Sequence, residues 1–205
     1  ILLAESTRLI QSLTAWVLDR ALRQLRTWRS EGLEVSVAVN LSARDLHDAK
    51  LPGASEALLT RHDVAPEWVE LEITETSIML DQRRALSVLT QLHELGTRLA
   101  VDDFGTGHSS LAYLSRLPVD TLKIDSSFVA GMTERWGNAT IVNATIGLAH
   151  DLGLSVTAEG VETQAQWTAL AAKGCDEAQG YFIAQPMPAS AFAALDGERK
   201  QLSVA

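Results

Sequence analysis

The amino-acid sequence predicts a (β/α)8 barrel, in which parallel strands alternate with the helices that surround them. Segments with a strand pattern and segments with a helix pattern follow one another along almost the whole chain of 205 residues. Within the strands, bulky residues such as Val37 and Val39 alternate with small or polar ones such as Ala38 and Asn40. The bulky set would face the outer helices and the other set the barrel interior. At the positions that face the barrel interior, the strands end in polar residues, and barrel active sites lie at that end of the strands.

The order of the elements follows from apolar periodicity and from glycine stops. Apolar residues recur at helical spacing from Leu9 to Leu25, and Gly32 ends this first helix. Gly96 and Gly153 end later helices in the same way. We expect helices at 6–29, 54–61, 83–95, 110–115, 138–152, 163–172 and 188–195. We expect strands at 35–40, 68–74, 98–102, 121–125, 154–159 and a weak one at 176–179.

Composition restricts the class of protein. We expect one domain over residues 1–195 and a loose polar tail at 196–205, because no linker or repeat divides the chain. The sequence has no apolar run of membrane-spanning length, and its single cysteine, Cys175, favours a reducing, cytoplasmic location for the domain. The formal net charge of −9 argues against binding to duplex nucleic acid. It leaves a small phosphate ligand open, because a metal ion can reverse the local charge of an acidic pocket.

Polar residues at strand ends, all on the side that faces the barrel interior, predict a metal centre. Oxygen ligands from Asn, Asp and Glu suit Mg²⁺ or Mn²⁺ rather than zinc, and the five histidines form no zinc-binding pattern. Several carboxylates around one cavity fit a two-metal site for attack by hydroxide on phosphorus. The strand ends are Asn40, Glu72, Asp102, Asp125 and Glu159.

The adjacent acids Asp102 and Asp103 and the inward-facing Lys123 each allow two interpretations. Two neighbouring carboxylates repel one another unless a cation lies between them, but a strand-end acid can also cap the next helix. Lys123 could lie beside a metal-bound water or a phosphate oxygen. It could instead form a purely structural buried ion pair with Asp125.

Six motifs in order resemble the EAL-type cyclic-di-GMP phosphodiesterases over nearly the whole chain, from residue 1 to residue 189. They are Val-Ala-Val-Asn-Leu-Ser at 37–42, Glu-Leu-Glu-Ile-Thr-Glu-Thr at 70–76, Asp-Asp-Phe-Gly-Thr-Gly at 102–107, Leu-Lys-Ile-Asp at 122–125, Ala-Glu-Gly-Val-Glu-Thr at 158–163, and Gly-Cys-Asp at 174–176 with Gln-Gly-Tyr at 179–181.

The resemblance implies hydrolysis of cyclic-di-GMP to the linear dinucleotide pGpG with two Mg²⁺ or Mn²⁺ ions, in bacterial second-messenger signalling. It also implies a homodimer and upstream sensory or GGDEF-type domains in a full-length protein that could be anchored to a membrane. By resemblance, the metal ligands are Asn40, Glu72, Asp102, Asp103 and Glu159, with Asp102 bridging the ions. Catalysis involves Lys123, Asp125 and Glu159, and Gln179 contacts substrate. The loop and its support comprise Glu75, Gly105, Thr106, Gly107 and Glu162.

Three features depart from the family pattern. His108 replaces the usual Tyr or Phe, and Ser126 replaces the usual Arg. The family's Glu-Ala-Leu motif lies upstream of the segment that matches residues 1–6, so we expect a domain without its first strands and one metal-binding glutamate. The Glu-Ala-Leu at 56–58 falls in a predicted helix, away from the barrel mouth, and is not that motif.

The missing glutamate leaves a second function open, a catalytically inactive module for cyclic-di-GMP binding or dimerisation. A metal-dependent lyase on a similar barrel is a weaker third possibility. We expect residues 1–205 alone to hydrolyse little cyclic-di-GMP and to be marginally stable or self-associating.

Overall fold

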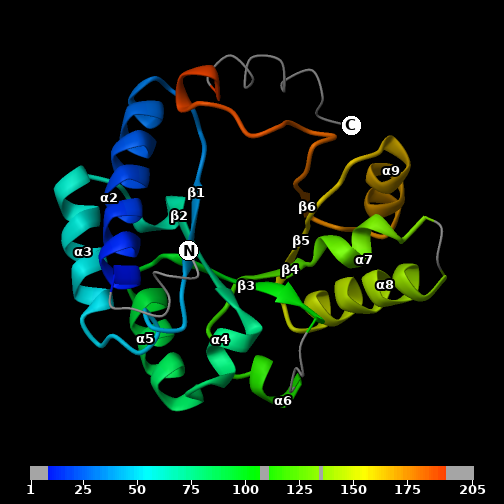
Figure 1. The fold of residues 1–205 in the computed structure, drawn as a ribbon, viewed down its shortest axis with the longest axis horizontal. Helices are drawn as coiled ribbons and strands as arrows, with labels where there is room; N and C mark the ends of the chain where they lie inside the picture. Colours follow the sequence, from blue (N-terminus) through cyan, green and yellow to red (C-terminus); the bar gives the residue numbers. More distant parts are fainter. Residues whose placement is uncertain (1–8, 107–110, 134–135, 193–205) are drawn as a thin grey trace.

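The computed structural model describes residues 9–106, 111–133 and 136–192, and these form a curved parallel sheet with helices on its outer side (Figure 1). The six strands pair in sequence order, β1-β2-β3-β4-β5-β6, which is the order of strands around a (β/α) barrel. The predicted α/β barrel class is thereby confirmed. The strands are β1 (Val37–Leu41), β2 (Val69–Thr74), β3 (Arg98–Phe104), β4 (Thr121–Ile124), β5 (Ser155–Ala158) and β6 (Glu177–Ala178).

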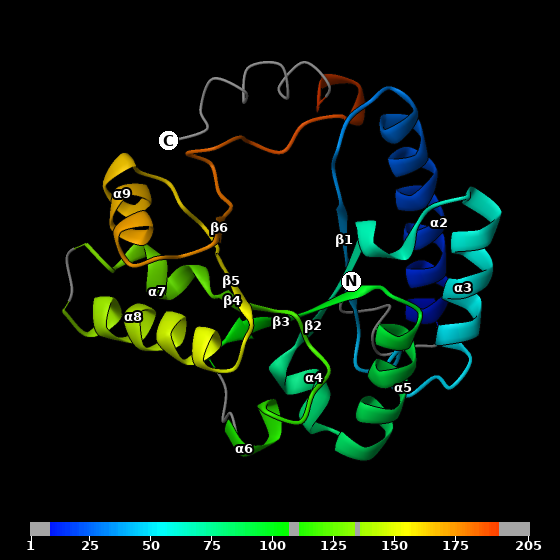
Figure 2. The same ribbon diagram turned by 180° about the vertical axis from the view of Figure 1, so that it is seen from behind.

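The helices follow the strands around the outside of the arc, as the two opposite views show (Figures 1 and 2). Most of them agree with the expected positions to within about three residues at each end. They are α2 (Leu9–Ser30), α3 (Leu51–His62), the 3₁₀ turn η1 (Pro66–Trp68), α4 (Glu75–Met79), α5 (Gln82–Glu94), α6 (Leu111–Leu114), α7 (Ser126–Ala130), α8 (Trp136–Asp151) and α9 (Gln164–Ala172).

Two short helices, α4 and α7, were not expected from the sequence. Each begins directly after a strand and has a side-chain cap. Thr74 Oγ1 accepts from the backbone N–H of Ser77, and Asp125 Oδ1 accepts from that of Ser127. Helices of five residues show no apolar periodicity, so their caps were the only available signal. The expected helix at 188–195 is described only to residue 192, and the predicted tail lies outside the described residues.

The predicted alternation of strand faces is confirmed. On β1, Val39 and Leu41 are buried toward the helices, whereas Ala38 and Asn40 are exposed. Outward-facing residues of the other strands, such as Leu71, are almost fully buried in one apolar core that includes α5 and α8. Polar residues that are also buried lie on the opposite face of the sheet, and these include Glu72, Thr121, Lys123 and Thr157.

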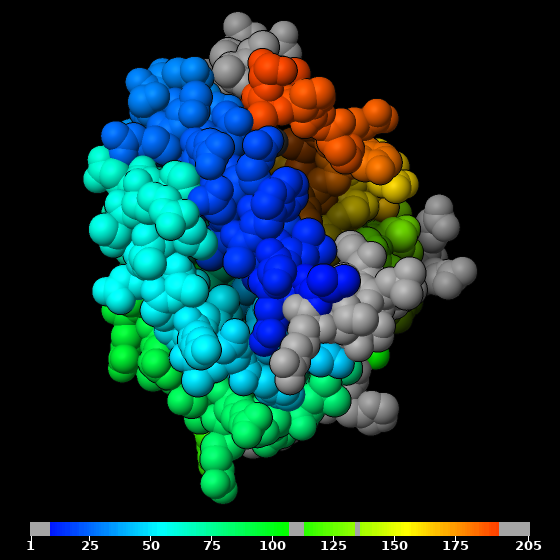
Figure 3. Space-filling model, turned by 60° about the vertical axis from the view of Figure 1, so that its left-hand side comes forward, coloured from blue at the N-terminus to red at the C-terminus, as the bar shows by residue number. Residues whose placement is uncertain are grey.

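The chain after β6 crosses from one end of the arc to the other. Residues 180–192 run toward the carboxyl end of α2, where the rings of Trp28 and Phe192 lie 4.8 Å apart between centroids (Figure 1). Within the described residues, β1 and β6 each pair with a single neighbouring strand. Figure 3 shows α2 beside α3 on one face of the molecule, and the exposed residues of α2 include the apolar Leu9 and Trp16. No helix among the described residues is long and apolar enough to cross a membrane.

Candidate active site

The carboxyl ends of the parallel strands bring the predicted polar residues to one edge of the sheet. The strand register places Asn40 opposite Glu72 and Thr74 opposite Asp102. Glu159 follows β5 and its backbone N–H donates to the carbonyl of Ile124, which extends the β4–β5 pairing by one residue. Residues that are far apart in the sequence therefore converge because their strands are parallel and in sequential order.

Lys123 lies at the centre of this edge and contacts three carboxylates. Its Nζ lies 2.6 Å from Glu72 Oε1, 2.5 Å from Glu159 Oε1 and 3.4 Å from Asp102 Oδ1. The Lys123 side chain is only 4% exposed, so its charge requires such partners. Burial by itself lowers the pKa of Lys123, but the hydrogen bonds to Glu159 and Glu72 outweigh burial and raise that pKa. The ammonium is therefore a fixed positive charge at neutral pH.

Two amide side chains extend the network to the neighbouring strands. Asn40 Nδ2 donates to Glu72 Oε2 at 3.1 Å. Gln179 Nε2 donates to Glu159 Oε1 at 2.7 Å. One hydrogen-bonded network around Lys123 thus joins side chains from β1, β2 and β4 and from the segments that follow β5 and β6.

Asp102, Asp103 and Glu159 form a group that fits a metal ion. Each offers a carboxylate oxygen, and the three oxygens lie within 4.8 Å of one another. Neighbouring strand residues normally face opposite sides, but the β3–β4 register shifts between Val101 and Phe104, and Asp103 has a φ of 55°. This irregularity allows both acids to reach the same site. Carboxylate oxygens are hard ligands of the kind that Mg²⁺ and Mn²⁺ prefer.

The electrostatics of this group also favour a cation. Loss of surrounding solvent, followed by the charges of Asp102 and Asp125, raises the pKa of Asp103. Burial raises the pKa of Glu159 in spite of the Lys123 ammonium. Both carboxyl groups are therefore poorly solvated and have other carboxylates nearby, and a divalent cation would stabilise their charged forms.

Asp125 does not join the Lys123 cluster. Its Oδ1 accepts hydrogen bonds from the backbone N–H of Ser127, at 3.1 Å, and from the Ser127 hydroxyl. Among the described residues, the ion pairs of Lys123 are with Glu72, Asp102 and Glu159. The alternative of an isolated Lys123–Asp125 ion pair is therefore wrong. Asp125 still contributes its charge to the site, through its effect on Asp103.

The loop residues predicted beside the acids are placed only in part. Glu75, the first residue of α4, is buried, and its Oε2 has no hydrogen-bond partner among the described residues. Thr106 Oγ1 donates to the carbonyl of Asp103 at 2.9 Å. Gly105 has a φ of 95°, and a Cβ there would lie 3.2 Å from the Phe128 ring. Gly107 and His108 lie outside the described residues.

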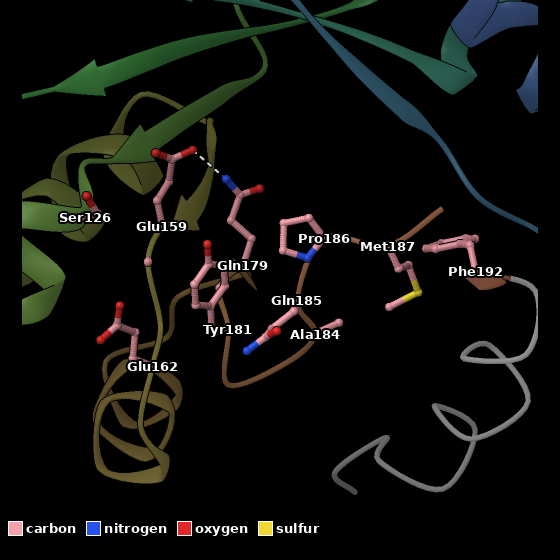
Figure 4. Close-up of a pocket in the computed structure, with 12 residues that line it drawn as sticks. Ser126, Glu159, Glu162, Gln179, Tyr181, Ala184, Gln185, Pro186, Met187 and Phe192 are labelled. Carbon is pink, nitrogen blue, oxygen red and sulfur yellow. Dashed lines mark hydrogen bonds between the residues drawn. The ribbon is translucent and has the colours of Figure 1, made fainter. Parts of the chain in front are cut away.

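A cavity of about 630 Å³ adjoins Glu159 and Gln179. Figure 4 shows Glu159, Glu162 and Gln179 together with Tyr181 and Pro186 around it. Gly180 allows the wall to form, because a Cβ there would lie within 2.3 Å of the Val161 backbone. The sequence reasoning did not identify this cavity, since most of its lining comes from chain without regular strand or helix. Further lining residues are Ser126, Gly160, Ala184, Gln185, Met187 and Phe192.

The Glu-Ala-Leu at 56–58 lies in the middle of α3, and the Glu56 side chain is exposed there. It borders a different cavity, together with Leu59 and Pro66. The prediction that this triplet lies in a helix is confirmed.

Comparison with protein families identifies the family of this chain, because residues 1–186 match the family model described as EAL domain. The chain belongs to the EAL domain family. Its sequence is 44% identical over 188 residues to the bifunctional diguanylate cyclase/cyclic di-GMP phosphodiesterase MucR of Pseudomonas aeruginosa, covering 91% of this chain and 27% of MucR. It is 39% identical over 189 residues to the cyclic di-GMP phosphodiesterase PdeR of Escherichia coli, covering 92% of this chain and 29% of PdeR.

A solved EAL-family structure has the same fold. The MucR phosphodiesterase in its c-di-GMP complex superposes with a TM-score of 0.89 at 43% identity, covering 93% of this chain and 77% of that one. The chain spans between about a quarter and a third of the length of the two named curated relatives.

Proposed function

We propose that this domain is a metal-dependent phosphodiesterase that hydrolyses one phosphodiester bond of cyclic-di-GMP and yields linear pGpG. The observation that carries the proposal is the buried Lys123 ammonium held among Glu72, Asp102 and Glu159, beside the metal-compatible oxygens of Asp102, Asp103 and Glu159. MucR and PdeR are named cyclic di-GMP phosphodiesterases, and a solved MucR structure contains c-di-GMP, which supports the substrate class.

The metal ions proposed are Mg²⁺ or Mn²⁺, which would polarise the phosphate and lower the pKa of a bound water. Their proposed ligands from this chain are Asn40, Glu72, Asp102, Asp103 and Glu159. Asn40 and Glu72 are hydrogen-bonded to one another, and the Asn40 carbonyl oxygen is the atom that would turn toward an ion.

The residues that would act on the reacting atoms are Lys123, Asp125 and Glu159. The oxygen of water forms a bond to phosphorus, the bond from phosphorus to the 3′ oxygen breaks, and a proton returns to that oxygen. Lys123 supplies fixed positive charge where negative charge accumulates on the phosphate. Glu159 has a raised pKa and a fixed orientation, which suit a group that orients water or exchanges a proton with it.

The neighbouring cavity is proposed to receive part of the dinucleotide. Gln179 borders both the acids and the cavity, and Glu162 lies on the cavity wall (Figure 4). Glu75, Gly105, Thr106 and Gly107 are proposed to hold the loop after Asp103 in place. A homodimer, an upstream GGDEF-type or sensory domain and a cytoplasmic location of the domain are proposed as well. MucR, whose name combines a cyclase with a phosphodiesterase, gives a precedent for the additional domain.

The test is hydrolysis of cyclic-di-GMP by the full-length protein that carries this chain, with pGpG quantified by chromatography in Mg²⁺ or Mn²⁺. Asp102→Asn should abolish turnover. The matched control is Asp151→Asn, the same change at an exposed residue that ends α8. Binding of cyclic-di-GMP without any turnover by the unmodified protein would instead assign the domain as a binding module.

A further inference from the structure

The Lys123 ammonium occupies the position between carboxylates that a cation would take. It contacts acids from β2, from β3 and from the segment after β5, and the exposed fractions of its side chain and that of Glu72 are 4% and 8%. Three carboxylates this close to one another are unfavourable unless positive charge lies among them. Lys123 supplies that charge from within the chain.

The individual oxygen atoms are not equally engaged. Both oxygens of Glu72 are used, Oε1 by Lys123 and Oε2 by Asn40. Glu159 is different, because Lys123 and Gln179 both contact Oε1. Asp102 resembles Glu159, since Lys123 and the Asp103 backbone N–H both contact Oδ1. Among the described residues, Glu159 Oε2 and Asp102 Oδ2 have no hydrogen-bond partner.

This distribution of contacts gives two metal ions unequal access to the carboxylate oxygens. For an ion at Asp102, Asp103 and Glu159, the oxygens Asp102 Oδ2 and Glu159 Oε2 are the ones that Lys123 does not contact. An ion that also requires Glu72 must share an oxygen with Lys123 or with Asn40, because each Glu72 oxygen already accepts one of these contacts. Such an ion would also approach the ammonium, and two positive charges at short range in a poorly solvated site repel one another strongly.

We propose that Lys123 is an internal counter-ion that competes with divalent metal for Glu72. It stabilises the acidic cluster before metal binds, leaves the Asp102–Asp103–Glu159 site accessible, and weakens the site that needs Glu72. Metal therefore binds in two steps of unequal affinity. This inference rests on the two-metal site of the proposed function, but its test measures binding and stability rather than hydrolysis.

The test compares wild type with Lys123→Met, which keeps the length of the side chain and removes its charge. Mn²⁺ binding is followed from the electron paramagnetic resonance signal of free Mn²⁺. Wild type should show a tighter and a weaker ion, and Lys123→Met should bind the weaker ion about tenfold more tightly. In EDTA, the melting temperature of Lys123→Met should fall by about 5 °C or more, and saturating Mn²⁺ should restore it.

The matched control is Lys173→Met. It makes the same change in net charge at the end of α9, where Lys173 Nζ donates a hydrogen bond to Asn143 Oδ1 at 3.5 Å. Since α9 runs antiparallel to the strands, its carboxyl end lies at the opposite edge of the sheet from the acids (Figure 1). Lys173→Met should bind Mn²⁺ as wild type does.

A double variant separates the counter-ion role from a merely structural one. Adding Glu72→Gln to Lys123→Met removes one of the uncompensated acids and should raise the melting temperature in EDTA above that of Lys123→Met alone. A packing role for Lys123 would make the double variant less stable still, and that result would overturn the proposal. Unchanged or weaker Mn²⁺ affinity of Lys123→Met, or its failure to fold in saturating Mn²⁺, would do so as well.

Discussion

Gln179 offers a sharp test of how the site holds Glu159. Its Nε2 donates to Glu159 Oε1 at 2.7 Å, and the same oxygen contacts Lys123 Nζ at 2.5 Å. Gln179→Met keeps the size of the side chain and removes the donor. Gln179→Glu keeps the shape and places a second carboxylate against Glu159. In both variants Glu159 would depend on Lys123 alone for its orientation.

The expected magnitudes follow from these contacts. A hydrogen bond to a charged group contributes about 1.5–3 kcal/mol, but Gln179 is exposed and water can replace part of the bond, so about 1 kcal/mol is expected. That loss corresponds to a roughly fivefold fall in kcat for Gln179→Met. In Gln179→Glu the like charge adds about 1 kcal/mol at the water-like dielectric of an exposed contact, which makes the fall roughly thirtyfold.

The assay is steady-state hydrolysis of cyclic-di-GMP in Mn²⁺, with the melting temperature recorded for each variant. The control is Gln164→Met, which removes a comparable amide donor that Gln164 directs to Thr168 at 3.2 Å on the exposed side of α9. The control should retain full activity. A Gln179→Glu variant as active as wild type would refute the reasoning, because Glu159 would then need no fixed orientation for the reaction.

Three further outcomes are expected. Mg²⁺ and Mn²⁺ should support turnover, whereas the larger Ca²⁺ should bind and support little, and equal turnover in Ca²⁺ would contradict the site. Gly180→Ala should destabilise the protein by about 1–3 kcal/mol in urea unfolding, because the new Cβ meets the Val161 backbone, and an unchanged midpoint would contradict that clash. Hydrogen bonds from His150 and from the Val156 N–H outweigh desolvation and lower the pKa of Asp176. The charged Asp176 therefore stabilises the folded protein at pH values above its pKa of about 3.9 in the unfolded chain, and this stabilisation is lost as the pH falls through the lower pKa of the folded state. Asp176→Asn should therefore flatten the acid side of the curve of stability against pH, and a curve identical to that of wild type would contradict this contribution.

The element order and the strand faces could be predicted because each rests on a regular pattern. Strands buried on one side by helices and on the other by a polar interior must alternate, and Val39 next to Asn40 illustrates the result. The convergence of Glu72, Lys123 and Glu159 followed from the same alternation of side chains, together with the sequential order of the parallel strands. A chain with six sequential strands leaves little freedom in where their carboxyl ends lie.

The details that escaped prediction depend on irregular backbone or on competition between partners. A regular strand would separate Asp102 from Asp103, and only the register shift after Val101 brings both to one site. Asp125 had two possible roles, and its capping bonds to Ser127 decide its orientation in the structure. The cavity beside Glu159 is built largely by irregular chain after β6, for which apolar periodicity gives no signal.

Charge balance gives an independent argument for the proposal that a phosphodiester substrate needs two ions at this site. Five carboxylates, those of Glu72, Asp102, Asp103, Asp125 and Glu159, lie at the site with one ammonium, so the formal charge is −4. One divalent ion would leave the site at −2, which repels a phosphodiester. Two would bring it to zero, which does not. Loss of surrounding solvent, and after it the charges of neighbouring carboxylates, raises the pKa values of Asp103 and Glu159. Lys123 by itself compensates a single carboxylate, so it can stabilise the folded cluster but cannot make it a site for an anionic substrate.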